Sequence, residues 1–68
     1  MNTQDLKAIA KKKLYSELFK YNITSDYARE YTAKVVAENR GITFEKALNV
    51  KIIFSPEVKK IKEHLIGI

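Results

Sequence analysis

The stretch TSDYAREYTAKVVAENRGITF, residues 24–44, carries the clearest helix boundaries in the chain. It opens with Thr-Ser-Asp, residue types whose side-chain oxygens accept hydrogen bonds from the N–H groups of a first helical turn. Near its end stands Gly41, and glycine often takes the left-handed conformation that follows a helix. These signals predict a helix over residues 25–40. Because small and apolar side chains cover two of its sides, we expect this helix to be the central one.

Further helices are predicted on both sides of this stretch. The first covers residues 3–21 and has an acidic side chain in its first turn, where the helix dipole favours it. The next covers 43–52 with Thr43 as its cap, and the last covers 55–66 and opens with Ser-Pro-Glu, a favourable order at a helix start. Both glycines and the single proline lie at these boundaries. We therefore expect one all-α domain over residues 1–68, a small bundle of three to four short helices.

Residues 50–54 are the ambiguous segment. Four of the five side chains are β-branched or aromatic, and Lys51 would stand in the centre of the apolar face if the helix continued. If the segment is extended, we expect its partner to be the same segment of a second subunit, because no other stretch of the chain has strand character.

The apolar stripes of the predicted helices define a candidate core with one pair of side chains from each helix. The stripe of the first helix drifts by about a quarter turn between its two halves, at 100° per residue. Either the helix wraps a curved core or frays at its start, or Leu6 and Ile9 dock on a second subunit. The eight predicted core residues are Leu14, Leu18, Tyr31, Val35, Phe44, Leu48, Ile61 and Leu65.

The size of the chain favours self-association. A chain of 68 residues buries a thin core, and the absence of cysteine excludes disulfides and thiolate zinc sites as additional support. One histidine cannot complete a metal cluster, so no metal site is expected. A homodimer is the simplest remaining support, and its candidate contacts are Leu6, Ile9, Ile66 and Ile68.

Composition also restricts the location and the chemistry. No apolar run approaches the length of a membrane span, and residues 1–13 carry four lysines without the apolar segment of a secretory signal, so we expect a cytoplasmic protein. The sequence contains no nucleophile elbow and no glycine-rich phosphate loop, and His64 stands at the edge of an apolar stripe. We expect neither an enzyme nor a bound cofactor.

The most specific arrangement is AKVVAENRGITFEKALNVKI, residues 33–52. It resembles the helix-turn-helix unit of DNA-binding regulators. In that unit a small residue, here Ala37, admits the second helix, Gly41 takes the turn, and Ile42 and Val50 fill the space between the two helices. Two positions depart from the pattern, because Arg40 replaces an apolar residue and Ala47 replaces a larger branched one.

The resemblance and the net charge of +5 together predict a regulator that binds nucleic acid, DNA in the first instance. On the exposed side of the second helix, Thr43, Lys46 and Asn49 are the candidate contacts to bases or phosphates. The candidate phosphate-binding lysines come from the first and last helices and are Lys11, Lys12, Lys59 and Lys60.

A second hypothesis is an inhibitor or adaptor that docks apolar helix faces on a larger protein. The drifting stripe of the first helix, the four tyrosines and the apolar C-terminal residues favour it.

Overall fold

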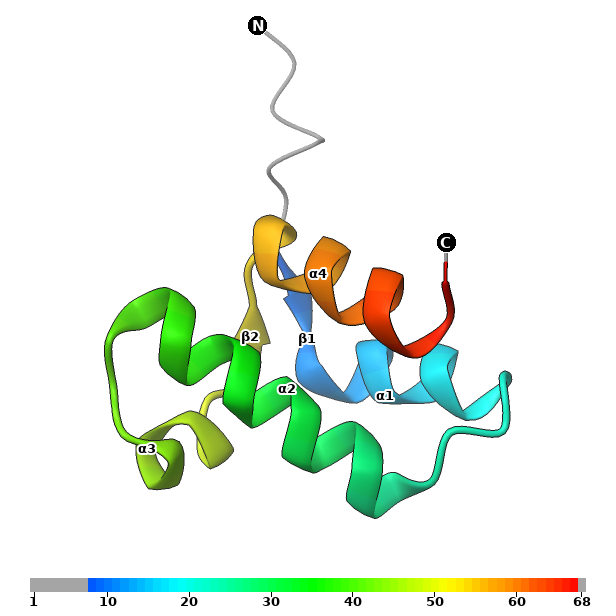
Figure 1. Ribbon diagram of the computed structural model, residues 1–68, viewed down its shortest axis with the longest axis horizontal. Coiled ribbons are helices and arrows are strands. Elements are labelled where there is room, and N and C mark those ends of the chain that lie inside the picture. Colours follow the sequence, from blue (N-terminus) through cyan, green and yellow to red (C-terminus); the bar gives the residue numbers. More distant parts are fainter. Residues whose placement is uncertain (1–7, 68) are drawn as a thin grey trace, which may run out of the picture.

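Four helices and one short strand pair make up residues 8–67, the part of the chain that the structure, a computed structural model, describes (Figure 1). The elements in chain order are β1 (Ile9–Ala10), α1 (Lys11–Phe19), α2 (Ser25–Arg40), α3 (Phe44–Leu48), β2 (Ile52–Ile53) and α4 (Ser55–Leu65). The predicted small all-α bundle is confirmed, with a two-residue strand pair added to it.

The central helix α2 forms where the sequence predicts it. The Thr24 hydroxyl accepts a hydrogen bond from the Tyr27 N–H at 3.2 Å, and Gly41 follows the helix in the left-handed region at φ 66°. Helix α2 contacts α1, α3 and α4, so its side chains help to bury all three. The prediction of a central helix over residues 25–40 is therefore confirmed.

The predicted start of the first helix is wrong. Ala8 to Ala10 are not helical, and α1 begins only at Lys11. Ile9 and Ala10 instead pair antiparallel with β2, Ile9 opposite Ile53, and the Lys11 N–H donates to the Lys51 carbonyl at 2.9 Å. The quarter-turn drift of the apolar stripe therefore marks a change from strand to helix, and not a helix with two faces.

The third helix is shorter than predicted. Helix α3 ends at Leu48, Asn49 caps it, and Ile52–Ile53 forms strand β2. The expected strand partner is also wrong, because β2 pairs with β1 of the same chain and not with a second subunit. Its β-branched side chains suit this pairing, and Ile53 is fully buried.

Helix α4 matches its prediction to within one residue. It covers Ser55–Leu65, and Ile66 is its C-cap rather than its last helical residue. The proline lies in the first turn, as the Ser-Pro-Glu order indicates. The glutamate of this first turn, Glu57, is buried.

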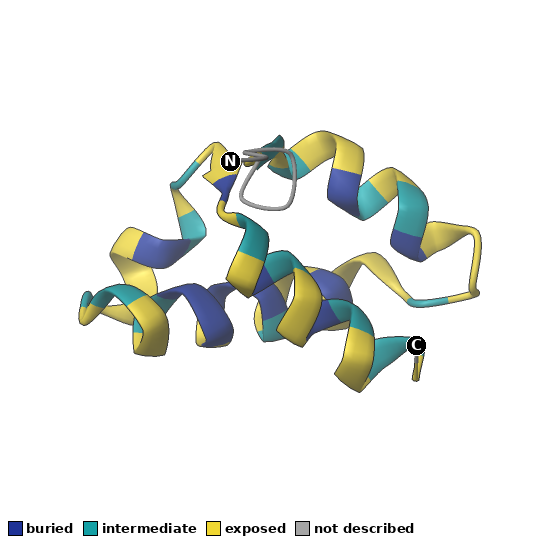
Figure 2. Ribbon diagram, turned by 90° about the horizontal axis from the view of Figure 1, so that it is seen from above, coloured by how far each residue is buried: buried dark blue, intermediate teal, exposed yellow. Residues whose placement is uncertain are grey.

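The core lies on the sides of the helices that face one another, where Figure 2 shows the buried segments. Of the eight predicted core residues, Tyr31, Leu48 and Leu65 are only partly buried, and Phe44 is 44% exposed. The prediction for Phe44 is wrong, because Ala47 is the residue of α3 that is buried in the core. The buried apolar residues are Leu14, Leu18, Ala28, Ala33, Val35, Val36, Ala47, Ile53 and Ile61.

Two of the four predicted dimer contacts pack within the chain. Ile9 and Ile66 are partly buried against the core, which removes much of their apolar surface from a subunit interface. Leu6 and Ile68 lie outside the described residues, and self-association stays a prediction. Within residues 8–67, no helix has the length and apolar character needed to cross a membrane.

Candidate nucleic-acid interface

The chain turns between α2 and α3 at Gly41, the residue at which the sequence predicts the turn. Gly41 is left-handed, and both its N–H and that of Ile42 donate to the carbonyl of Ala37, the second at 3.1 Å. Ala37, Ile42 and Val50 are partly buried against the core. These contacts fix the direction in which α3 leaves the turn.

Two of the three contact residues predicted around α3, Thr43 and Asn49, form hydrogen bonds to the backbone of α3. The Thr43 hydroxyl accepts a hydrogen bond from the Lys46 N–H at 3.1 Å, and the Asn49 amide donates to the Glu45 carbonyl at 3.2 Å. The Lys46 side chain is exposed. Because α3 has five residues, it is only about 7.5 Å long.

A cavity of about 510 Å³ lies where the end of α3 and the start of β2 meet β1 and the start of α1. We call it the basic hollow, since three lysines and no acidic side chain line it among the residues that the structure describes. It gathers Lys11, Lys12 and Asn49 from the predicted set. Its lining residues are Ala10, Lys11, Lys12, Leu48, Asn49, Lys51 and Ile52.

Lys51 is the charged lining residue that is missing from the predicted contact residues. If the helix had continued, the charge of Lys51 would have stood in an apolar face. This conflict was the sequence feature that could have indicated an exposed Lys51 outside the helix. In the structure Lys51 lies just before β2 and its side chain is exposed at the hollow.

Lys11 also has a structural role. Its Nζ donates to the carbonyl of Leu48, the last residue of α3, at 2.8 Å, and lies 5.9 Å from the centre of the Tyr15 ring. The ammonium group therefore satisfies a helix-end carbonyl. An ammonium group has three N–H donors, so this bond leaves two for a ligand.

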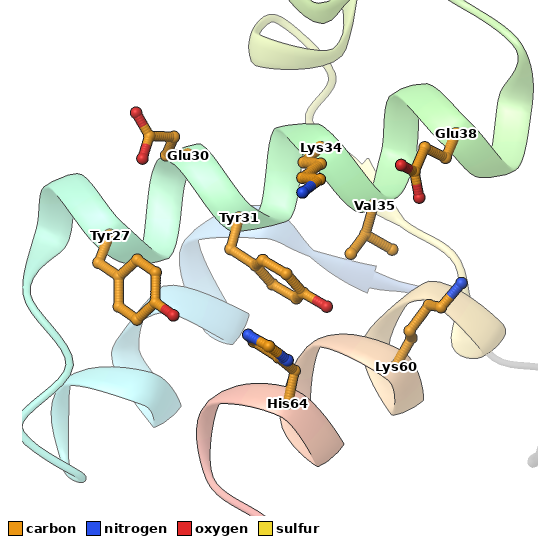
Figure 3. A pocket seen from close by; sticks show the side chains of 8 residues that line it. All are labelled: Tyr27, Glu30, Tyr31, Lys34, Val35, Glu38, Lys60 and His64. Atoms are coloured by element: carbon orange, nitrogen blue, oxygen red, sulfur yellow. The ribbon is translucent and has the colours of Figure 1, made fainter.

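Lys60 lines a different site, a groove of about 430 Å³ between α2 and α4 (Figure 3). The groove carries mixed charge, because Glu30 and Glu38 line it together with Lys34 and Lys60. Its other features include the rings of Tyr31 and His64, which stack with centroids 4.2 Å apart and an interplanar angle of 12°. Lys59 is exposed on α4 and does not line the basic hollow.

Arg40, which replaces an apolar residue of the helix-turn-helix pattern, forms a buried ion pair next to β2. The guanidinium group donates from Nε to Glu57 Oε2 and from Nη2 to Glu57 Oε1, both at 2.9 Å, and from Nη2 to the Ile52 carbonyl at 2.8 Å. It also lies 4.0 Å from the centre of the Phe54 ring. A charged side chain at this position thus joins α2 to β2 and α4.

Glu57 receives two further hydrogen bonds at 2.8 Å, from the Asn39 amide and from the Phe54 N–H. Burial by itself raises the pKa of this carboxyl, but the hydrogen bonds from Arg40, Phe54 and Asn39 together outweigh burial and lower the pKa below its ordinary value. The carboxylate is therefore charged, and it holds β2, one wall of the hollow, in place. The sequence by itself places Glu57 in the first turn of the last helix and does not indicate its ion pair.

Among residues 8–67, no three histidine or acidic side chains gather where they could hold a metal ion. Comparisons of the chain with protein-family models, with curated proteins and with solved structures found no match. The interpretation of the site therefore rests on its geometry and charge.

Proposed function

We propose that this protein is a small, non-catalytic regulatory module that binds nucleic acid at the basic hollow and the adjoining corner between α2 and α3. The observation that carries the proposal is the collection of Lys11, Lys12 and Lys51 around one open cavity that no acidic side chain of residues 8–67 lines. Phosphate contacts by lysine supply most of the sequence-independent affinity for nucleic acid.

The side chains have different roles in this proposal. Lys12 and Lys51 are exposed and bind phosphates, while Lys11 contributes its charge from a position that the Leu48 carbonyl holds. Lys46 extends the positive surface along α3. The Asn49 amide donates one of its two N–H groups to the chain, so its other N–H and its carbonyl oxygen remain for a base.

The test is a titration of labelled DNA and RNA, single-stranded and duplex, followed by fluorescence anisotropy at several salt concentrations. Binding should weaken as salt rises. Lys12→Gln and Lys51→Gln should each weaken binding to all sequences and reduce the slope of log affinity against log salt by about one unit.

Lys59→Gln is the matched control, because it removes the same charge from an exposed position that does not line the hollow. It should leave the salt slope unchanged. No binding at about 50 mM salt, where non-specific contacts still register, would contradict the proposal. Equal effects of all three variants would contradict the assignment of the site.

A second candidate function is docking on a larger protein. Within residues 8–67, six large apolar side chains are about half exposed, and a docking interface would cover such surface. Capture from native lysate with and without nuclease separates the two functions, because a protein partner should remain after nuclease and a nucleic acid should not. The six residues are Phe19, Tyr21, Tyr27, Phe44, Ile52 and Phe54.

A further inference from the structure

The floor of the basic hollow is apolar. Ala10 from β1, Leu48 from α3 and Ile52 from β2 line it between the lysines. Ile52 is 46% exposed, so it presents a large apolar surface to any occupant. A ligand that only neutralised the lysines would leave this surface in contact with water. The hollow therefore suits an occupant that carries anionic groups beside an apolar face.

This floor is preformed. Ala10 and Ile52 stand opposite each other in the strand pair, and Arg40 holds the Ile52 carbonyl at 2.8 Å. The volume of about 510 Å³ lies within the range of about 300–1,000 Å³ that is common for small-molecule sites. An unstacked base with its sugar is a ligand of small-molecule size. The cavity is already open between the strands and α3, so it can admit such a ligand without a rearrangement of the strands.

Duplex DNA fits these features poorly. The bases of a duplex are stacked inside it, and its backbone would offer only phosphates and sugars to the apolar floor. Helix α3, about 7.5 Å long, offers little more than one turn to a major groove that is about 12 Å wide. The internal hydrogen bonds of Thr43 and Asn49 further reduce what α3 can offer to base edges.

We propose, resting on the nucleic-acid binding argued above, that the hollow takes a single strand. One unstacked base lies against Ile52 and Leu48, and the neighbouring phosphates lie on Lys12 and Lys51. A single strand supplies an apolar base face beside each phosphate, which is the combination that the lysines and the apolar floor together require.

The experiment compares three probes of equal length at one salt concentration: a single strand, the same strand with its bases removed, and a duplex. The intact single strand should bind about fivefold or more tightly than the strand without bases, because only the former covers the apolar floor. It should also bind more tightly than the duplex.

Variants of Ile52 connect this preference to the floor. Ile52→Thr keeps a β-branched side chain in the strand and should abolish most of the preference for the strand with bases. Ile52→Val is the conservative control and should retain the preference. Lys51→Gln should weaken binding of both single-stranded probes alike. Circular dichroism and thermal melts check that each variant is folded.

The outcomes separate this inference from the function on which it rests. Equal binding of all three probes would overturn the single-strand inference and leave nucleic-acid binding intact. Binding of none of them would overturn both, and so would binding of vesicles of anionic phospholipid in place of every oligonucleotide.

Discussion

Two ion pairs join helices to α4, and they differ in their surroundings. The side chains of Arg40 and Glu57 are 20% and 0% exposed, and Nε lies 2.9 Å from Oε2. The side chains of Lys62 and Glu17 are 32% and 33% exposed, and Nζ lies 2.6 Å from Oε1. The first pair joins α2 to α4, and the second joins α1 to α4.

The difference shows that burial, and not the contact distance, determines what an ion pair requires. Buried Glu57 needs several donors because no water replaces a missing one, and it receives them from Arg40, Asn39 and Phe54. Glu17 keeps part of its hydration and needs no such set. The hydrogen bond from Lys62 is the main cause that lowers the pKa of Glu17. Four predictions test this contrast.

Arg40→Ala should have the largest effect. It leaves the Glu57 carboxylate buried without its cation and should destabilise the fold by about 3–5 kcal/mol, enough to unfold much of so small a domain. Urea denaturation followed by circular dichroism measures the loss. Arg29→Ala is the control on the same helix, since its side chain is 62% exposed, and it should change stability by less than about 0.5 kcal/mol. Similar losses for the two variants would refute the contrast.

Acid should destabilise the protein next most strongly. The folded pKa values of Glu57 and Glu17 lie below the ordinary value of 4.5, so both carboxylates contribute stability above that pH. This stability is lost as the pH falls through the lower folded values. Urea midpoints measured from pH 7 downward should therefore fall below about pH 4.5. Most of the fall should persist in Glu17→Gln, because Glu57 causes it; a fall that disappears in this variant would show that the pair of Glu17 and Lys62 dominates.

Gly41→Ala tests the end of α2, which positions Arg40. A Cβ atom at residue 41 would meet no atom within 4 Å, but φ is 66°, so the cost is backbone strain alone. We expect a loss of about 1–2 kcal/mol, and a smaller loss for Gly41→Asn because asparagine tolerates the left-handed region. Thermal melts measure both variants. An Asn variant as unstable as the Ala variant would contradict the strain argument.

Glu17→Gln should have the smallest effect. Ion pairs that stay in contact with water contribute little, and both side chains of this pair are about one third exposed, so the variant should lose less than about 1 kcal/mol at low salt and still less at high salt. Urea denaturation at two salt concentrations gives the difference. A loss comparable to that of Arg40→Ala would mean that the Lys62 contact stabilises the fold as strongly as the buried pair does.

The candidate site was only partly predictable. The sequence named Lys11, Lys12 and Asn49, because lysine charge and a helix boundary are local properties. It did not predict that they share a hollow, and it assigned no role to Lys51. Which charged side chains share a cavity depends on how the chain brings distant segments together, and no local pattern encodes that.

The sequence by itself determined α2, the turn at Gly41 and all but the end of α4, because caps, proline and glycine act within a few residues of where they stand. Tertiary structure decided where α1 begins and where α3 ends. Both boundaries depend on the pairing of Ile9–Ala10 with Ile52–Ile53. The backbone hydrogen bonds of this pairing and the burial of Ile53 exist only when these two segments, far apart in the sequence, meet. That pairing also shapes the hollow on which the proposed function rests.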